Sequence, residues 1–200
     1  MKQLVFIHGG ETFDTYNEYV DALRSWTYDP TKEPQKRWKH SLSERLGEDW
    51  EVLMPTMPAK YNAKFLEWSI WFEKVIPYLK DGVILVGHSL GGIFLAKYLN
   101  EHELPVRIQA TFLVAAPFDT EDTDYSLADF VLTESLSGLA ERGGEIFIYH
   151  SEDDPVVPSV AYRKYQAVLP DAKIRIFNDR GHFMQLEFPE LIAEIKAVRK

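Results

Sequence analysis

Residues 83–98 read VILVGHSLGGIFLAKY, and this stretch decides the fold. Four aliphatic residues, 83–86, form the kind of run that is found in a strand buried on both faces of a parallel sheet. A glycine-rich turn around Ser89 follows, and a helix-forming segment comes directly after it. Gly-x-Ser-x-Gly between a strand and a helix is typical of a nucleophile elbow, a sharp turn that exposes a serine hydroxyl above the sheet edge. The pattern predicts that Ser89 is a nucleophile and that the Leu90 backbone N–H, at a helix N-terminus, stabilises an oxyanion.

The pentapeptide alone has a second interpretation, a glycine-rich turn whose serine does no chemistry. Gly and Ser are common residues, so about one chain in fifteen of this length contains the motif by chance. The flanking strand and helix favour the nucleophile. The rest of the chain must decide between the two interpretations.

Composition limits the classes of protein that the chain can represent. Its 200 residues suggest one domain spanning 1–200, and 46% apolar and 14% aromatic residues favour a packed core. A net charge of −9, from 22 basic and 31 acidic residues, argues against a nucleic-acid partner. The absence of cysteine excludes thiolate metal sites and suits the cytoplasm. We expect no signal peptide and no membrane span, because no apolar run approaches 18 residues.

Apolar runs alternate with helical patterns six times along the chain. This order predicts an α/β fold, a three-layer sandwich with a six-stranded, mainly parallel sheet. The expected strands are 4–7, 50–54, 83–86, 108–115, 145–150 and 172–177. The expected helices are 37–46, 63–79, from the elbow to about 100, 127–139, 159–169 and a last helix that starts near Pro189. Trp68 and Trp71 of the second helix are expected in the core, Pro77 should kink or end it, and Ser159 should cap its helix.

Two long connections are candidates for a role at a site. The first is an extended loop at 11–40, whose aromatic residues either line a pocket or bury a short helix at 16–26. The second is 118–141, which could form a small cap. Residues 119–124 contain four acidic side chains, but no glycine is at the sixth position, and Phe130 occupies the place of the bidentate glutamate. A solvated turn is therefore preferred to a calcium loop, and no metal site is predicted.

Four candidate residues follow the ends of predicted strands: Gly10, Ser89, Asp154 and His182. Chemistry collects at this edge of a parallel sheet. A serine hydroxyl needs a base to take its proton, imidazole titrates near neutrality, and a carboxylate fixes the imidazole tautomer. Of the neighbouring Asp153 and Asp154, only one can meet the ring. The spacing to 157–158 selects Asp154.

These loops resemble those of the α/β-hydrolase superfamily, in which the order is nucleophile, acid, histidine. Asp154-x-x-Val157-Pro158 resembles its acid loop, and Gly181-His182-Phe183 resembles its histidine loop. Within the superfamily the chain is most similar to the small serine hydrolases related to retinoblastoma-binding protein nine. The resemblance implies Ser89 as nucleophile, Asp154 as acid and His182 as base. The segment 24–40 has no clear counterpart in that family.

The resemblance and the residues together predict a cofactor-free serine hydrolase, a carboxylesterase-type enzyme that cleaves a small-molecule acyl substrate through an acyl-enzyme. The N–H groups of Leu90 and Gly10 would form the oxyanion hole, and His8 would orient its loop without transferring protons. Alternatives are a catalytically weak binding protein on the same fold, or an acyltransferase or thioesterase with the same triad. The oligomeric state stays open. The expected pocket residues are Glu11, Met57, His88, Phe118, Val157 and Phe183.

Charge near the expected site suggests a substrate preference. Four acidic residues follow strand ends, so the mouth of the pocket is expected to be negative and neutral esters to be preferred. These residues are Glu11, Asp119, Glu121 and Asp122.

Overall fold

The apolar runs of the sequence form one parallel sheet of six strands in the order β2-β1-β3-β4-β5-β6. The computed structural model describes residues 1–33, 35–121, 123 and 125–198. The strands are β1 (Lys2–Ile7), β2 (Trp50–Leu53), β3 (Val83–His88), β4 (Ile108–Val114), β5 (Glu145–Ser151) and β6 (Lys173–Phe177). Every neighbouring pair is parallel. The predicted fold class is confirmed, and each predicted strand is present.

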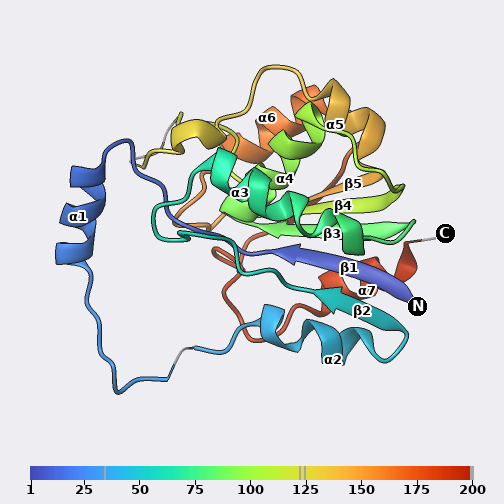
Figure 1. Ribbon diagram of the computed structural model, residues 1–200, viewed down its shortest axis with the longest axis horizontal. Helices are drawn as coiled ribbons and strands as arrows, with labels where there is room; N and C mark the ends of the chain where they lie inside the picture. The colour runs from blue at the N-terminus through green and yellow to red at the C-terminus, as the bar shows by residue number, and fades with distance from the viewer. Residues whose placement is uncertain (34, 122, 124, 199–200) are drawn as a thin grey trace.

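Helices cover both faces of this sheet (Figure 1). The helices α2 (Leu42–Leu46) and α7 (Pro189–Ala197) lie on one face. The other face carries α3 (Phe65–Glu73), α4 (Leu90–Glu101), α5 (Ser137–Arg142) and α6 (Val160–Val168). Successive residues of a strand point to opposite faces. In β1, Leu4 and Phe6 therefore join the core under α2 and α7, while Val5 and Ile7 join the core under α3 and α4.

Several helices differ from their predicted bounds. The predicted helix 37–46 begins as a 3-10 turn, η1 (Trp38–Ser41), before α2, which ends at Gly47 with φ 93° as expected of a C-cap. The predicted helix 63–79 stops at Glu73, and a 3-10 turn, η2 (Ile76–Tyr78), follows. Pro77 has no N–H to continue the helical ladder, so this break was expected.

One side-chain prediction for the helices, that for Trp71, is wrong, and the N-cap prediction for Ser159 is confirmed in position only. Trp68 is fully buried, but Trp71 is 44% exposed, because it lies on the outer side of α3. Ser159 is at the N-cap of α6, but its side chain makes no capping hydrogen bond.

The predicted helix 127–139 is also wrong. Its place is taken by a 3-10 turn, η3 (Ala128–Phe130), an extended stretch and the short α5. Tertiary contacts use backbone groups that a helix would pair: Lys97 donates to the Asp129 carbonyl, and the Leu132 N–H donates to the Phe118 carbonyl. The leucines that gave the helical spacing are buried, as a helix would have required: Leu132, Leu136 and Leu139. The backbone that carries them is mostly irregular and is not one continuous helix.

The segment 11–40 leaves the sheet and returns to it. Its helix α1 (Tyr16–Ser25) stands away from the layered body and is joined to it by extended segments (Figure 1). Thr15 and Glu18 form a capping box that starts the helix where it was predicted. None of its residues is buried, and Tyr16 is 72% exposed. The aromatic residues therefore do not form a core of their own, which was one of the two expectations for them.

In the part of the chain that the structure describes, no helix combines the length and apolarity that a bilayer crossing requires.

Candidate active site

Ser89 lies at the junction of β3 and α4 in a strained conformation, with φ 54° and ψ −123°. The turn is possible only because the residues two positions before and after Ser89, Gly87 and Gly91, lack side chains. A Cβ on Gly87 would lie 2.3 Å from the Gly91 carbonyl oxygen, and a Cβ on Gly91 would lie 2.3 Å from the Ile7 carbonyl oxygen. A positive φ at a serine is costly and is retained where the surrounding structure enforces it. This is the geometry expected of a nucleophile elbow.

A cavity of about 640 Å³ opens at the carboxyl edge of the sheet beside Ser89. The structure brings several of the predicted site residues together in its wall. These are Gly10, Ser89, Leu90 and His182. No hydrogen bond joins the Ser89 hydroxyl to His182 within the described residues. Catalytic hydrogen bonds are often loose before substrate binds.

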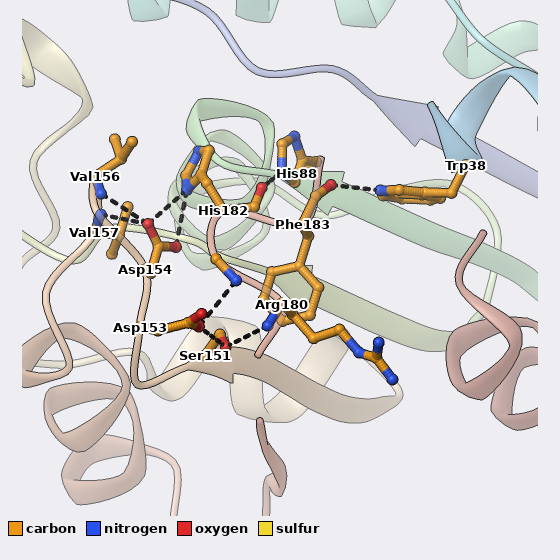
Figure 2. Close-up of polar contacts among 11 residues, drawn as sticks. Trp38, His88, Ser151, Asp153, Asp154, Val156, Val157, Arg180, His182 and Phe183 are labelled. Atoms are coloured by element: carbon orange, nitrogen blue, oxygen red, sulfur yellow. Dashed lines mark hydrogen bonds and ion pairs between the residues drawn. The ribbon is translucent and has the colours of Figure 1, made fainter. Parts of the chain in front are cut away.

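His182, in the cavity wall, is paired with Asp154 (Figure 2). The Asp154 Oδ2 atom lies 2.9 Å and its Oδ1 atom 3.1 Å from the His182 Nδ1 atom. Oδ1 also accepts hydrogen bonds from the N–H groups of Val156 and Val157, at 2.8 and 3.0 Å. The Asp154 side chain is fully buried. This arrangement directs the Nδ1 proton to the carboxylate and leaves Nε2 free to accept a proton.

Asp153 holds the same loop from the other side. Its Oδ1 atom accepts hydrogen bonds from the Gly181 N–H at 2.9 Å and from the Ser151 hydroxyl at 2.5 Å. The Ser151 hydroxyl in turn accepts the Arg180 N–H at 3.1 Å. The hydrogen bond from Ser151, followed by that from Gly181, lowers the pKa of Asp153. Asp153 therefore contacts the backbone before His182 and not the imidazole ring, as expected for the residue that is not paired with the histidine.

Two further rings hold the histidine loop, and sequence reasoning did not assign them this role. The buried His88 donates from Nε2 to the His182 carbonyl at 2.9 Å, and the Trp38 indole N–H donates to the Phe183 carbonyl at 2.8 Å (Figure 2). Burial, and then the charge of His182, lowers the pKa of His88 to about 3, so His88 is a neutral donor. Trp38 belongs to the segment 24–40, which had no expected counterpart.

His8 joins two loops, as expected of a loop-orienting histidine. Its Nε2 atom accepts the Met57 N–H at 2.9 Å, and its Nδ1 atom lies 2.6 Å from the Gly9 carbonyl. Burial is the main cause that lowers its pKa. One nitrogen accepts and the other donates, so the ring is a neutral Nδ1–H tautomer with no free nitrogen for proton transfer.

The loop after β1 lies close to the elbow. A Cβ on Gly9 would lie 3.1 Å from the Ser89 Cβ. The Glu11 N–H is occupied, because it donates to the Lys60 carbonyl at 2.8 Å. Gly10 and Leu90 line the cavity, so their N–H groups stay the candidates for an oxyanion hole.

The structure places three of the six expected pocket residues in the cavity wall. Glu11, His88 and Val157 line the cavity. The other three predicted residues are core residues and do not line it: Met57, Phe118 and Phe183, exposed by 1%, 6% and 0%. Their immediate neighbours line it instead: Thr56, Pro117 and Met184. Neighbouring residues of a loop can point in different directions, so a shift of one position exchanges core and pocket.

The expected negative mouth is also wrong for the described residues. Asp119 and Glu121 are paired with Lys164 and do not line the cavity, and Asp122 lies outside the described residues. Of the four acidic residues, Glu11 alone lines it. Three cations that sequence reasoning missed are in the wall: Arg37, Lys39 and Lys60.

Two other side chains of the cavity wall, Glu11 and Tyr125, have shifted pKa values. Desolvation raises the pKa of Glu11, and the charge of His182 partly offsets this. Burial, followed by the charges of Asp154, Asp119 and Glu11, raises the pKa of Tyr125 to about 12. The Tyr125 hydroxyl is buried and has no hydrogen-bond partner among the described residues. Its raised pKa keeps this hydroxyl protonated at neutral pH.

Other segments contribute to the site in different degrees. Ser126 and Leu127, from the segment 118–141, line the cavity, and a cap role for this segment stays a prediction. The aromatic residues of 11–33 do not line it, although Trp26 packs at 5.7 Å against Tyr61, which does. Among the residues described, no group of three or more His, Asp or Glu side chains is placed to hold a metal ion.

The chain is similar to several known proteins. The family model described as serine hydrolase matches residues 30–187. Serine hydrolase RBBP9 of Rattus norvegicus is 28% identical over 153 residues, which cover 74% of this chain and 78% of the relative. The crystal structure of the ydeN gene product from B. subtilis superposes with a TM-score of 0.78 at 18% identity, over 99% of this chain and 98% of that chain.

A meta-cleavage product hydrolase from Pseudomonas fluorescens has a TM-score of 0.68 at 14% identity, over 98% of this chain and 89% of that chain. These structural neighbours establish the α/β-hydrolase fold. The match of the family model over most of the sequence goes further, and the chain belongs to the serine hydrolase family.

Proposed function

We propose that this protein is a carboxylesterase-type enzyme that cleaves an acyl substrate through an acyl-enzyme on Ser89, with His182 as base and Asp154 as acid. One observation carries the proposal: Ser89, at a strained elbow, faces the same cavity as His182, whose Nδ1 atom is held 2.9 Å from a buried carboxylate. Membership of the serine hydrolase family supports it.

The first half of the reaction forms the acyl-enzyme. The His182 Nε2 atom accepts the proton of the Ser89 hydroxyl as the oxygen attacks the acyl carbon. The carbonyl oxygen becomes an oxyanion, and the N–H groups of Leu90 and Gly10 stabilise it at the N-terminus of α4. The protonated imidazole then gives its proton to the leaving oxygen, and the bond to the leaving alcohol breaks.

The second half releases the acid. A water molecule gives a proton to His182 and attacks the acyl carbon, and the same proton returns to the Ser89 oxygen as the ester bond breaks. In both halves Asp154 holds the tautomer and stabilises the imidazolium. Because Val156 and Val157 donate to its carboxylate, Asp154 is already in position before the reaction starts.

A fluorophosphonate probe tests the nucleophile directly. We expect the wild-type protein to be labelled covalently and Ser89→Ala not to be, because the probe needs an activated serine. Ser89 lies in the cavity wall, so the substitution leaves no hole in the core. Ser43→Ala, on the exposed surface of α2, is the matched control and should be labelled like wild type. Labelling of folded Ser89→Ala would refute the mechanism, and an unlabelled wild type would favour a binding protein.

The class of acyl compound needs a separate experiment. Esters, thioesters and amides of varied acyl length, each followed by release of the free acid, would separate carboxylesterase, thioesterase and amidase activities. Transfer to an added alcohol would identify an acyltransferase. We expect ester cleavage to be the fastest of these. A cytoplasmic location is part of the same proposal and can be checked by fractionation.

A further inference from the structure

The cavity has a positively charged side. Arg37 and Lys39 flank Trp38 at the start of η1, and Lys60 lies in the loop that follows β2. All three line the cavity. Within the described residues, none of the three makes an ion pair. The Lys60 ammonium lies 4.8 Å from the centroid of the Tyr61 ring.

These cations are close enough to disturb one another. Burial, followed by the charges of Arg37 and Lys60, lowers the pKa of Lys39. Lys39 and Lys60 also contribute to the lowered pKa of His8, which follows β1 beside the elbow. Like charges gathered in a partly desolvated wall destabilise the fold, and such arrangements are concentrated at functional sites. The chain has 31 acidic residues and a net charge of −9, yet no described acidic residue forms an ion pair with these three cations.

The acidic residue of the described wall, Glu11, has its backbone against the Lys60 loop, because its N–H donates to the Lys60 carbonyl. Its carboxyl forms no ion pair with the three cations among the described residues, and the charge of His182 acts on its pKa. The cations belong to the side formed by η1 and the loop after β2, at the β2 end of the sheet. A molecule that spans the cavity can therefore place an anionic group among the cations and its acyl carbon beside Ser89.

We propose that the substrate carries an anionic group, a carboxylate or a phosphate, which Arg37, Lys39 and Lys60 bind while the scissile acyl bond lies at Ser89. The guanidinium of Arg37 can donate two parallel hydrogen bonds to either group, and the two ammonium groups supply further charge. This inference rests on the proposed function and names the substrate class for the same site. It reverses the preference for neutral esters that the sequence suggested.

A pair of esters that differ by one charge tests the proposal. The mono-4-nitrophenyl ester of glutaric acid has a free carboxylate, and its methyl ester has the same chain without the charge. We expect wild-type kcat/KM to be about tenfold or more higher for the free acid at low salt, and the ratio to fall toward one as salt is added. A ratio of one or less at low salt would overturn the proposal.

Single substitutions test whether the preference for the charged ester comes from the cations of the cavity wall. Lys39→Gln and Lys60→Gln should each lower the ratio by about three- to tenfold, which is what one charge in a partly solvated site supplies. Lys74→Gln removes the same charge from an exposed position at the end of α3, outside the cavity, and should keep the wild-type ratio. An equal drop in Lys74→Gln would show a general effect of net charge and would overturn the assignment.

A binding measurement separates this proposal from the proposed function. Calorimetry on the full chain with Ser89→Ala, titrated with glutarate and separately with inorganic phosphate, requires no turnover. We expect binding of at least one anion that is weakened by Lys39→Gln and unchanged by Lys74→Gln, and the tighter of the two identifies the group. If no ester is cleaved but this pattern holds, the proposed function fails and the anion site stands. If esters are cleaved without a charge preference and neither anion binds at 10-millimolar concentration, on the order of weak ligand affinities, the anion site fails and the proposed function stands.

Discussion

Asp153 and Asp154 are neighbours in one loop, yet they hold different parts of the histidine loop. Asp154 contacts the His182 ring from a fully buried position, whereas Asp153 accepts the Gly181 N–H from an exposed one. Neighbouring residues in an extended loop point in different directions, so this division was expected. Their amide variants should therefore differ in what they change.

We predict that Asp154→Asn is nearly inactive and that Asp153→Asn keeps most activity. An amide at 154 favours the wrong imidazole tautomer, which in the trypsin example of this effect lowers kcat by roughly 10⁴-fold. An amide at 153 still has a carbonyl oxygen to accept the Gly181 N–H, so kcat should change by no more than about threefold. Steady-state kinetics on both folded variants is the measurement. The opposite ranking would assign the acid to Asp153.

Sequence reasoning named single residues where chemistry restricts the choice, and the structure brings Ser89 and His182 to one cavity. Ser89 lies in a motif that only one backbone conformation fits, and the histidine loop follows a strand end. It failed where one position decides between two faces of a loop, as at Phe183, which is in the core while Met184 lines the cavity. Nothing in the residue types separates such neighbours, because both are apolar.

Among the elements, η1 makes a contact that the primary sequence does not reveal. The Trp38 indole N–H donates to the Phe183 carbonyl, and its backbone N–H donates to the Gln185 carbonyl at 2.9 Å. Its ring packs edge-on against Phe6 and Phe188 at 5.4 and 5.6 Å. The segment 24–40 thus ends in a residue that ties the histidine loop to the sheet.

Replacing Trp38 by Phe should keep most of the packing and remove the indole hydrogen bond. The Phe183 carbonyl is then buried without this donor, which costs about 1–3 kcal/mol of unfolding free energy. Because Phe183 follows His182, we also expect kcat to fall by about fivefold, as an imidazole that is held less firmly spends less time in position. Urea unfolding and kinetics test both effects. Trp71→Phe, on the exposed side of α3, is the control, and equal effects from it would remove this role from Trp38.

Strands were easier to predict than helices, and the reason is burial. The interior strands β3 and β4 are buried along almost their whole length, so their sequences are mostly apolar and have few alternatives. The helix predicted at 127–139 had the right spacing of leucines, but its backbone groups bond to Lys97 and Phe118 instead. The helix α1 lies within the range 16–26 that was one of two alternatives, and its capping box starts it although it buries nothing. Local signals predict that a helix starts, and tertiary contacts decide where it lies.

Across the whole molecule, charge is distributed unevenly. The chain is acidic, yet the cavity beside Ser89 is lined by three cations and one described acidic residue at its rim. Composition gives only the sum of the charges, so it could not predict this local excess. Burial also affects the histidines. It is the main cause of the lowered pKa values of three of them: His8, His88 and His150.

These histidines should make the fold sensitive to acid. The pKa of His88 is about 3 in the folded protein and 6.5 in an unfolded chain, so below pH 6.5 the unfolded state binds a proton that the folded state does not. Stability is therefore lost as the pH falls from 6.5 toward 3. At pH 5 this loss amounts to about 2 kcal/mol for His88 alone, from the difference of about 1.5 pH units.

The variant His88→Gln isolates this contribution, because glutamine does not titrate and its side-chain N–H can still donate to the His182 carbonyl. We predict that the difference in unfolding free energy between pH 7 and pH 5 is smaller in His88→Gln than in wild type by about 2 kcal/mol. Urea titrations at the two pH values measure it, whatever the absolute stability of the variant. His102→Gln, at the exposed end of α4, is the control and should keep the wild-type difference. If His88→Gln keeps that difference as well, His88 is protonated in the folded protein at pH 5, and its hydrogen bond to the histidine loop must then come from an imidazolium.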